Sequence, residues 1–227
     1  DRRQRQMCIR DSEKTNGRGL ICIPSGNHDM DRLARSLSPE EMKIAFAFLL
    51  SMPGAPFIYY GDEIGLRYVE GLTSVEGGYG RTGSRSPMQW DKTPNAGFSC
   101  APAEKLYVRQ DDAPDRPDAA SQCADEASLR SEVKRLIALR MAHPALQSKG
   151  TVSFLADNYP LAYVRSSAEE SILVIINPSA TPAVLSAEEL CALNKELLYT
   201  VGGTVKENAD HALQVAGGTA AFISLTK

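Results

Sequence analysis

The sequence lacks a long uninterrupted apolar run and an excess of charge of either sign. Its longest apolar stretch, residues 44–60, is broken by Pro53, Gly54 and Pro56, whereas a membrane-spanning helix needs about 20 consecutive apolar residues. Lys and Arg number 25 against 28 Asp and Glu, which leaves a net charge of -3. Without a basic surplus there is no electrostatic attraction for a phosphate backbone. We therefore expect neither a membrane nor a nucleic acid as a partner.

Cysteine is scarce and scattered. The five cysteines are Cys8, Cys22, Cys100, Cys123 and Cys191. Their odd number, the lack of a C-x-x-C pair and the lack of a His at zinc spacing argue against a disulfide framework and a zinc site. We expect free thiols and no metal. This usage favours a reducing compartment, although secreted proteins can also carry few disulfides.

What the sequence does contain is enough apolar material for a core, since 43% of its 227 residues are hydrophobic. One or two domains are expected. Residues 1–12 (DRRQRQMCIRDS) differ from the rest because they hold four basic residues, show no helix or strand period and do not begin with Met. They are similar to the translation of a sequencing-library adapter, and we interpret them as a non-native segment. An ordinary charged linker is the alternative.

A strand–helix–strand pattern follows. Residues 20–24 and 56–60 are short apolar runs of the kind seen in buried parallel strands. Between them, residues 38–41 (SPEE) form a capping box with Pro at the first helical position. The helix body, residues 44–50, is apolar on all sides and ends at Pro53-Gly54. This βαβ unit predicts an α/β fold with a parallel sheet.

The remainder divides into a loop, a helix and a β module. Residues 71–117 are rich in Gly and Pro and predict a long functional loop. A helix is expected from near Ser128 to just before Pro144, with one apolar face of Leu129, Val133, Leu136 and Ile137. Short strands are then predicted at 151–156, 161–166, 171–178, 197–201, 212–215 and 219–225. We place the domain boundary near Gly150 and expect an antiparallel sandwich beyond it.

The residues that follow the two parallel strands carry the candidate chemistry, because the carboxyl ends of such strands form active sites. After the first strand come Gly26-Asn27-His28-Asp29 and then Arg32, a carboxylate, an imidazole and a guanidinium that together can hold several hydroxyls of one ligand. Turn and cap roles are the alternative for these residues. After the second strand come Asp62 and Glu63, for which a solvated turn is the better interpretation than a catalytic pair.

A third polar segment, residues 81–91 (RTGSRSPMQWD), lies in the long loop. It contains Trp90, the only tryptophan, which either packs in a core or stacks on a sugar ring; we favour core packing. Arg81 and Arg85 either line a cleft or fix the loop by bonding carbonyls, and both alternatives stay open.

Together, the NHD motif, FIYYGDEIG, the RSPMQWD…NAGFS loop and the βαβ-then-β order resemble the α-amylase family of glycoside hydrolases. The last motif is most similar to the subgroup of α-glucosidases, oligosaccharide-trimming enzymes and trehalose synthases. The resemblance implies a (β/α)₈ barrel, which takes about 250 residues when complete. Residues 13–149 would then hold its last two strands and their helices, and residues 150–227 an all-β antiparallel sandwich.

The resemblance also implies a function. Family members are retaining enzymes with a carboxylate nucleophile and a carboxylic acid/base, and these lie on the fourth and fifth barrel strands, absent from this chain. The parent protein would hydrolyse or transfer α-glucosidic bonds of malto- or isomalto-oligosaccharides, and this fragment alone would be inactive. Asp29 matches the family's transition-state stabiliser. His28, Asn27, Arg32 and Arg85 are the expected substrate-binding residues.

Two alternatives accompany this hypothesis: a trehalose synthase-like isomerase, and a non-catalytic carbohydrate-binding or interaction relative. One departure from the family pattern is Ser25, where many members have a large apolar residue; it leaves Asp29 in place but affects the shape of the subsite. Members of this subgroup are commonly cytoplasmic and metal-independent, so we expect a cytoplasmic protein with no cofactor and an α-glucan oligosaccharide as its substrate.

Overall fold

The structure is a computed structural model that describes residues 19–77, 80–156 and 159–226. The segment interpreted as non-native, residues 1–12, lies outside the described residues. The chain forms two compact units. The first comprises the residues up to Ile23, Lys43–Pro56 and the chain from Leu136 onward, and the second comprises Pro24–Met42 and Phe57–Arg135.

The predicted βαβ unit is present. Strands β1 (Cys22–Pro24) and β2 (Ala55–Phe57) pair with each other. They run parallel, because the hydrogen bonds from the Ala55 N–H to the Ile21 carbonyl and from the Ser25 N–H to the Phe57 carbonyl, both 2.8 Å, advance along both strands in the same direction. The prediction that both strands are buried is wrong: most of their residues are exposed or half-exposed. Among the described residues each strand pairs only with the other, so each has one edge without a neighbouring strand.

The helix between them, α2 (Pro39–Ser51), begins with the predicted capping box. The Glu41 N–H donates to the Ser38 hydroxyl at 3.3 Å, and the Glu41 carboxylate accepts from the Ser38 N–H at 2.8 Å. That backbone bond lowers the pKa of Glu41. The helix stops just before a turn at Gly54, whose φ is 92° and where a Cβ would lie 2.5 Å from the Ile21 carbonyl oxygen. Only glycine fits there without strain.

The second unit is mostly irregular, as predicted for residues 71–117. Its regular elements are short, namely η1 (Leu33–Arg35), η2 (Asp62–Ile64), η3 (Thr82–Arg85), η4 (Pro94–Gly97), η5 (Ala103–Lys105) and α3 (Ala119–Ala124). A small core of Ile64, Leu66, Met88 and Ala119 lies beneath them. The sequence analysis did not predict α3, which is capped by the Asp118 side chain accepting from the Ser121 N–H at 2.7 Å.

Helix α4 (Leu129–Ala142) confirms the predicted helix, and η6 (Pro144–Leu146) follows it. Leu129, Val133 and Leu136 are buried, whereas Ile137 is 36% exposed. Ile137 therefore lies at the margin of the apolar face.

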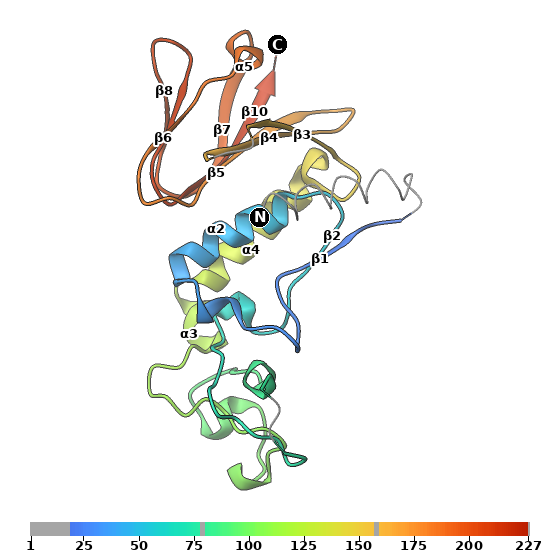
Figure 1. The fold of residues 1–227 in the computed structure, drawn as a ribbon, viewed down its shortest axis with the longest axis vertical. Coiled ribbons are helices and arrows are strands. Elements are labelled where there is room, and N and C mark those ends of the chain that lie inside the picture. Colours follow the sequence, from blue (N-terminus) through green and yellow to red (C-terminus); the bar gives the residue numbers. More distant parts are fainter. Residues whose placement is uncertain (1–18, 78–79, 157–158, 227) are drawn as a thin grey trace. The chain divides into compact units, whose positions relative to one another are not determined.

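The C-terminal part of the chain confirms the six predicted strands to within a few residues. These six strands are β3 (Thr151–Ala156), β4 (Leu161–Ser166), β5 (Ser171–Asn177), β7 (Asn194–Gly202), β9 (Leu213–Val215) and β10 (Thr219–Thr226). Two further short strands, β6 (Ala183–Leu185) and β8 (Val205–Glu207), and a short helix α5 (Glu188–Cys191) were not predicted. They form two antiparallel sheets, of order β3-β4-β5-β10-β7 and β6-β9-β8 (Figure 1). Side chains of both sheets share one core, with Leu173 and Ile223 from the larger sheet and Leu213 and Val215 from the smaller.

A buried polar network ties the end of α2 to this β structure within the first unit. The Arg165 guanidinium on β4 donates to the carbonyls of Ser51, of Gln147 at 2.8 Å and of Gly150 at 3.0 Å. The Tyr163 hydroxyl lies 2.6 Å from that of Ser51. Burial lowers the pKa of Arg165 to about 10 and raises that of the Tyr163 hydroxyl.

A second buried guanidinium, that of Arg140 on α4, fixes the chain after α2. It donates to the carbonyls of Leu50, Met52 and Gly54 at 2.7, 2.8 and 2.9 Å. These carbonyls belong to the last turn of α2 and the turn beyond it, where no intrahelical donor is available. Arg140 therefore acts as a C-terminal cap supplied by another helix.

Replacing Arg140 by Leu should lower the free energy of unfolding by about 3 kcal/mol, because each buried polar group left without a partner costs about 1–3 kcal/mol. Urea unfolding followed by circular dichroism measures this. Lys134→Leu is the matched control, since Lys134 is exposed on the same helix; its effect should stay within about 0.5 kcal/mol. Equal midpoints for the two variants would contradict the capping role.

Candidate active site

The loops that follow β1 and β2 are joined by a buried ion pair. Arg32 Nη1 lies 3.1 Å from Asp62 Oδ1, and the two side chains are 0% and 1% exposed. The Ser25 hydroxyl donates to Asp62 Oδ2 at 2.7 Å and accepts from the Tyr59 N–H at 2.9 Å. Polar residues that follow the two parallel strands thus lie together, as the sequence predicts. The interpretation of Asp62 as part of a solvated turn is wrong, because its carboxylate is buried.

Arg32 is further held by two tyrosine rings. Its guanidinium carbon lies 4.2 Å from the centre of the Tyr59 ring and 4.6 Å from that of Tyr60, within the range of cation–π attraction. It also donates to the Tyr60 carbonyl. Burial raises the pKa of Tyr59 to about 12. Arg32, a predicted substrate-binding residue, is buried in this structure, where its guanidinium contacts Asp62 and the two tyrosines.

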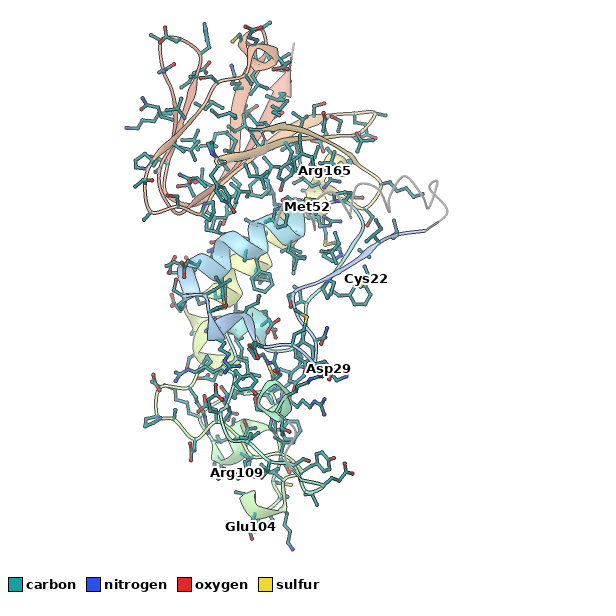
Figure 2. All side chains as sticks on the ribbon, in the orientation of Figure 1. Cys22, Asp29, Met52, Glu104, Arg109 and Arg165 are labelled. Atoms are coloured by element: carbon teal, nitrogen blue, oxygen red, sulfur yellow. The ribbon has the colours of Figure 1, made fainter. Side chains whose placement is uncertain are left out.

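The NHD motif forms a turn that presents two side chains to solvent. The Asn27 side-chain oxygen accepts from the Asp29 N–H at 2.8 Å, an arrangement typical of Asx turns. The Asp29 side chain is 46% exposed and that of His28 65% exposed, with 3.5 Å between His28 Nε2 and Asp29 Oδ2. Figure 2 shows Asp29 in the loop beyond β1. Asn27 therefore orients the turn, while His28 and Asp29 are available to a ligand.

Two arginines from the third segment converge on Asp29. Arg85 Nη2 and Arg81 Nη1 lie 3.0 Å and 3.3 Å from Asp29 Oδ1. The hydrogen bond with Arg81 is the largest cause that lowers the pKa of Asp29, and the charge interaction with His28 and the hydrogen bond with Arg85 act in the same direction. Asp29, Gly80, Arg81 and Arg85 line a cavity of about 580 Å³.

Arg81 and Arg85 were predicted either to line a cleft or to fix the loop by bonding carbonyls, and the structure shows some of each. Arg81 and Arg85 line a cavity, and Arg85 Nε also donates to the His28 carbonyl at 3.1 Å.

The third segment is anchored to the first two by hydroxyl groups that the sequence analysis did not single out. The Ser84 hydroxyl donates to the Met30 carbonyl. The Tyr59 hydroxyl donates to the Ser84 carbonyl at 3.2 Å, and that of Tyr60 to the Ser86 carbonyl at 2.8 Å. The adjacent tyrosines at the end of the second strand were the available signal, since a half-buried tyrosine hydroxyl usually has a hydrogen-bond partner.

A second cavity of about 410 Å³ lies in the same unit. Its lining includes Tyr60, Glu63, Arg85, Trp90, Phe98 and Tyr107. Trp90 is 52% exposed, so the favoured prediction of core packing is wrong. Glu63 lines this cavity, whereas Asp62 is buried in the ion pair with Arg32. The two adjacent carboxylates therefore lie in different environments.

Residues 19–77, 80–156 and 159–226 include no cluster of three or more His, Cys, Asp or Glu side chains that could hold a metal ion. None of the helices in the described part of the chain combines the length and hydropathy that a membrane crossing requires. Cys22, Cys100, Cys123 and Cys191 are free thiols, as predicted; Cys8 lies outside the described residues.

Comparison with known proteins decides the family. A family model described as the catalytic domain of alpha amylase matches residues 4–149. The chain belongs to the α-amylase family. The resemblance carried by NHD, FIYYGDEIG and RSPMQWD…NAGFS is thereby confirmed.

Similar proteins in this family include a trehalose synthase/amylase from Mycobacterium tuberculosis, 36% identical over 162 residues, which are 66% of this chain and 26% of that protein. A probable alpha-glucosidase from Rhizobium meliloti is 30% identical over 234 residues, covering 96% of this chain and 41% of that protein. Among solved structures, the trehalulose synthase MutB from Pseudomonas mesoacidophila matches with a TM-score of 0.81 and 23% identity, over 98% of this chain and 46% of that one. The chain thus has the fold of this family and spans less than half the length of these relatives.

Removal of Arg81 should raise the pKa of Asp29 toward the ordinary value of 3.8. Because the pKa in the folded state is lowered, the ion pairs of Asp29 are present above that pKa and are lost as the pH falls through it. Titration of the Asp29 carboxyl carbon by NMR should show a larger rise in Arg81→Met than in Arg85→Met. An unchanged pKa in Arg81→Met would contradict the assignment of Arg81 as the main partner.

Proposed function

We propose that the protein containing this chain is a retaining α-glycosidase that hydrolyses or transfers α-glucosidic bonds of malto- or isomalto-oligosaccharides. One observation carries the proposal. In a member of the α-amylase family, Asp29 presents a half-exposed carboxylate of lowered pKa beside a cavity of about 580 Å³, next to the exposed imidazole of His28.

Each residue has a role that follows from its contacts. The carboxylate of Asp29 accepts hydrogen bonds from hydroxyls of the sugar at the cleaved bond, which stabilises the distorted ring of the oxocarbenium-like transition state. His28 binds a hydroxyl of the same sugar. Arg85 lies in the cavity lining and orients Asp29. Asn27 and Arg32 act as positioning residues, since Asn27 holds the Asp29 N–H and Arg32 holds the loop from below.

The bond-breaking groups come from outside this chain in our proposal. A retaining mechanism needs two carboxyl groups about 5–5.5 Å apart, one as nucleophile and one as acid/base. We infer that both lie on earlier barrel strands of the complete protein. The present chain then supplies transition-state binding but not the covalent step, and is inactive when alone.

The same proposal assigns the architecture. Residues 13–149 hold the last two strands and helices of a (β/α)₈ barrel, and residues 150–227 form an all-β antiparallel sandwich domain. The parallel pair β1–β2 with α2 between them, and the shared core of two antiparallel sheets after Gly150, support this assignment. We further propose a cytoplasmic enzyme without a cofactor, which agrees with the exposed free thiols of the described cysteines.

An isomerase is the second candidate, because the Mycobacterium tuberculosis relative is a trehalose synthase/amylase. Isomerisation, hydrolysis and transfer differ in their products. An isomerase converts maltose to trehalose, whereas a hydrolase releases glucose and a transferase forms longer oligosaccharides. Chromatography of the products from maltose separates these outcomes.

Asp29→Asn tests the proposed role in the complete reading frame that contains this chain. The variant keeps the shape but removes the charge, so kcat/KM for maltose and isomaltose should fall roughly a hundredfold to a thousandfold, as on loss of a single transition-state contact. Asp31→Asn is the control, because Asp31 is exposed and pairs with Arg35, and it should leave kcat/KM unchanged. Activity equal to that of the parent in Asp29→Asn would refute the role.

A further inference from the structure

The end of α4 carries a buried guanidinium whose hydrogen-bonding capacity is only partly used. Arg140 is 8% exposed and donates three hydrogen bonds, all to carbonyls at the end of α2 and in the turn beyond it. A guanidinium has five N–H donors, so two donors of Arg140 have no acceptor among the described residues. The buried Arg165 differs, because it donates five hydrogen bonds to backbone carbonyls. The capping role of Arg140 therefore leaves two of its donors unexplained.

The charge of these two guanidinium groups is also uncompensated. All their hydrogen bonds go to carbonyls, so in the part of the chain that the structure describes neither group pairs with a carboxylate. Burial is the main cause that lowers the pKa of Arg165, and the positive charge of Arg140 acts in the same direction. Two like charges withdrawn from water gain stability when an anion comes close to them.

Arg140 lines a cavity of about 680 Å³ at the end of α4. The ammonium group of Lys149 and the hydroxyls of Ser148 and Ser167 belong to the same lining, and each of them can donate a hydrogen bond. The residues that complete the lining are Met141, Pro144, Gln147, Gly150 and Ala168. None of the lining residues is Asp or Glu. The cavity therefore combines two cationic side chains with two hydroxyl donors and contains no carboxylate.

The turn between β4 and β5 holds Ser167 in a fixed orientation. The Ser167 hydroxyl oxygen accepts from the Glu169 N–H at 3.1 Å and from the Glu170 N–H at 3.2 Å, which leaves the hydroxyl hydrogen available to a ligand. The Glu170 carboxylate is engaged elsewhere, because it accepts from the Ala145 N–H at 3.0 Å and lies 2.9 Å from His143 Nδ1. A donor that is already oriented costs little conformational entropy on binding.

We propose that this cavity binds a phosphate group, either as inorganic phosphate or as the monoester of a small molecule. A phosphate group carries nearly two negative charges at neutral pH. Its oxygens can accept from Arg140, Lys149 and the two serine hydroxyls together, and such charge-assisted hydrogen bonds are among the strongest in proteins. The volume lies within the range of about 300–1,000 Å³ that is typical of small-molecule sites, so there is room for an ester. The inference goes beyond the proposed function, because it uses none of the residues of the candidate active site.

Isothermal titration calorimetry of the 227-residue chain with sodium phosphate and with glucose 6-phosphate, at constant ionic strength, tests the site. We expect saturable binding with a dissociation constant of about 1 mM or lower. Lys149→Gln removes one cation from the lining and should weaken the affinity about three- to tenfold, the usual size of one partly exposed charged contact. Ala168→Asp adds a like charge beside the ligand and should weaken it about tenfold or more.

Both substituted positions are exposed, so these variants should keep the fold, which circular dichroism checks. Lys134→Gln is the matched control, because it removes an exposed cation from α4 outside the cavity; its affinity should equal that of the unmodified chain. Tighter binding of glucose 6-phosphate identifies an ester as the ligand, whereas equal or weaker binding identifies inorganic phosphate, and both results support the site. Lack of saturable binding of either compound, or equal affinities in Lys149→Gln, Ala168→Asp and Lys134→Gln, would overturn it.

Discussion

The candidate site depends on one buried charge pair, that of Arg32 and Asp62. Both side chains are withdrawn from water, and the desolvation of two charges is costly unless further contacts accompany the pairing. Those contacts are present, because two tyrosine rings lie against the guanidinium and the Ser25 hydroxyl donates to the carboxylate. The pair joins the loop after β1 to the loop after β2. Removal of either partner would leave the other as an uncompensated buried charge.

The exposed charged side chains of the candidate site belong to segments that this buried pair helps to hold. Asp29 precedes Arg32 by three residues in the same loop, and the segment carrying Arg81 and Arg85 is fixed to that loop through Ser84 and Met30. Positive charge on one side of Asp29 keeps its carboxylate ionised and orients it, while half of the side chain stays exposed. An ionised acceptor held in place is suited to stabilise a sugar ring that develops positive charge.

Local signals in the sequence predicted much of this structure. The capping box at Ser38 and Glu41 is encoded within four residues, and the β strands after Gly150 have alternating or apolar runs between turn residues, so both were predictable. The exposure of Trp90 was not, because it depends on left-handed backbone at Asn95 and Ala96 and on a distant bond from Gln110. The short elements α3, β6 and β8 have too few residues to show a period.

In the candidate site, too, locally encoded features were predicted and features that depend on distant residues were not. The NHD motif located Asp29 and His28 because the motif itself is local. The burial of Arg32 could not be predicted from the motif, because it depends on Tyr59, Tyr60 and Asp62, which come from elsewhere in the chain. A sequence motif identified the loop, but only the three-dimensional arrangement separated its exposed side chains, such as His28 and Asp29, from the buried side chain of Arg32.

Hydrogen–deuterium exchange of Arg32→Met tests the dependence of the site on this buried pair most directly. We expect faster exchange in residues 25–32 and 59–64, with no change in the strands β4, β5 and β10. Arg35→Met, which removes an exposed arginine whose partners are Asp31 and Glu70, should leave residues 25–30 and 59–64 unaffected. Exchange in residues 25–32 of Arg32→Met that matches the unmodified chain would contradict the account.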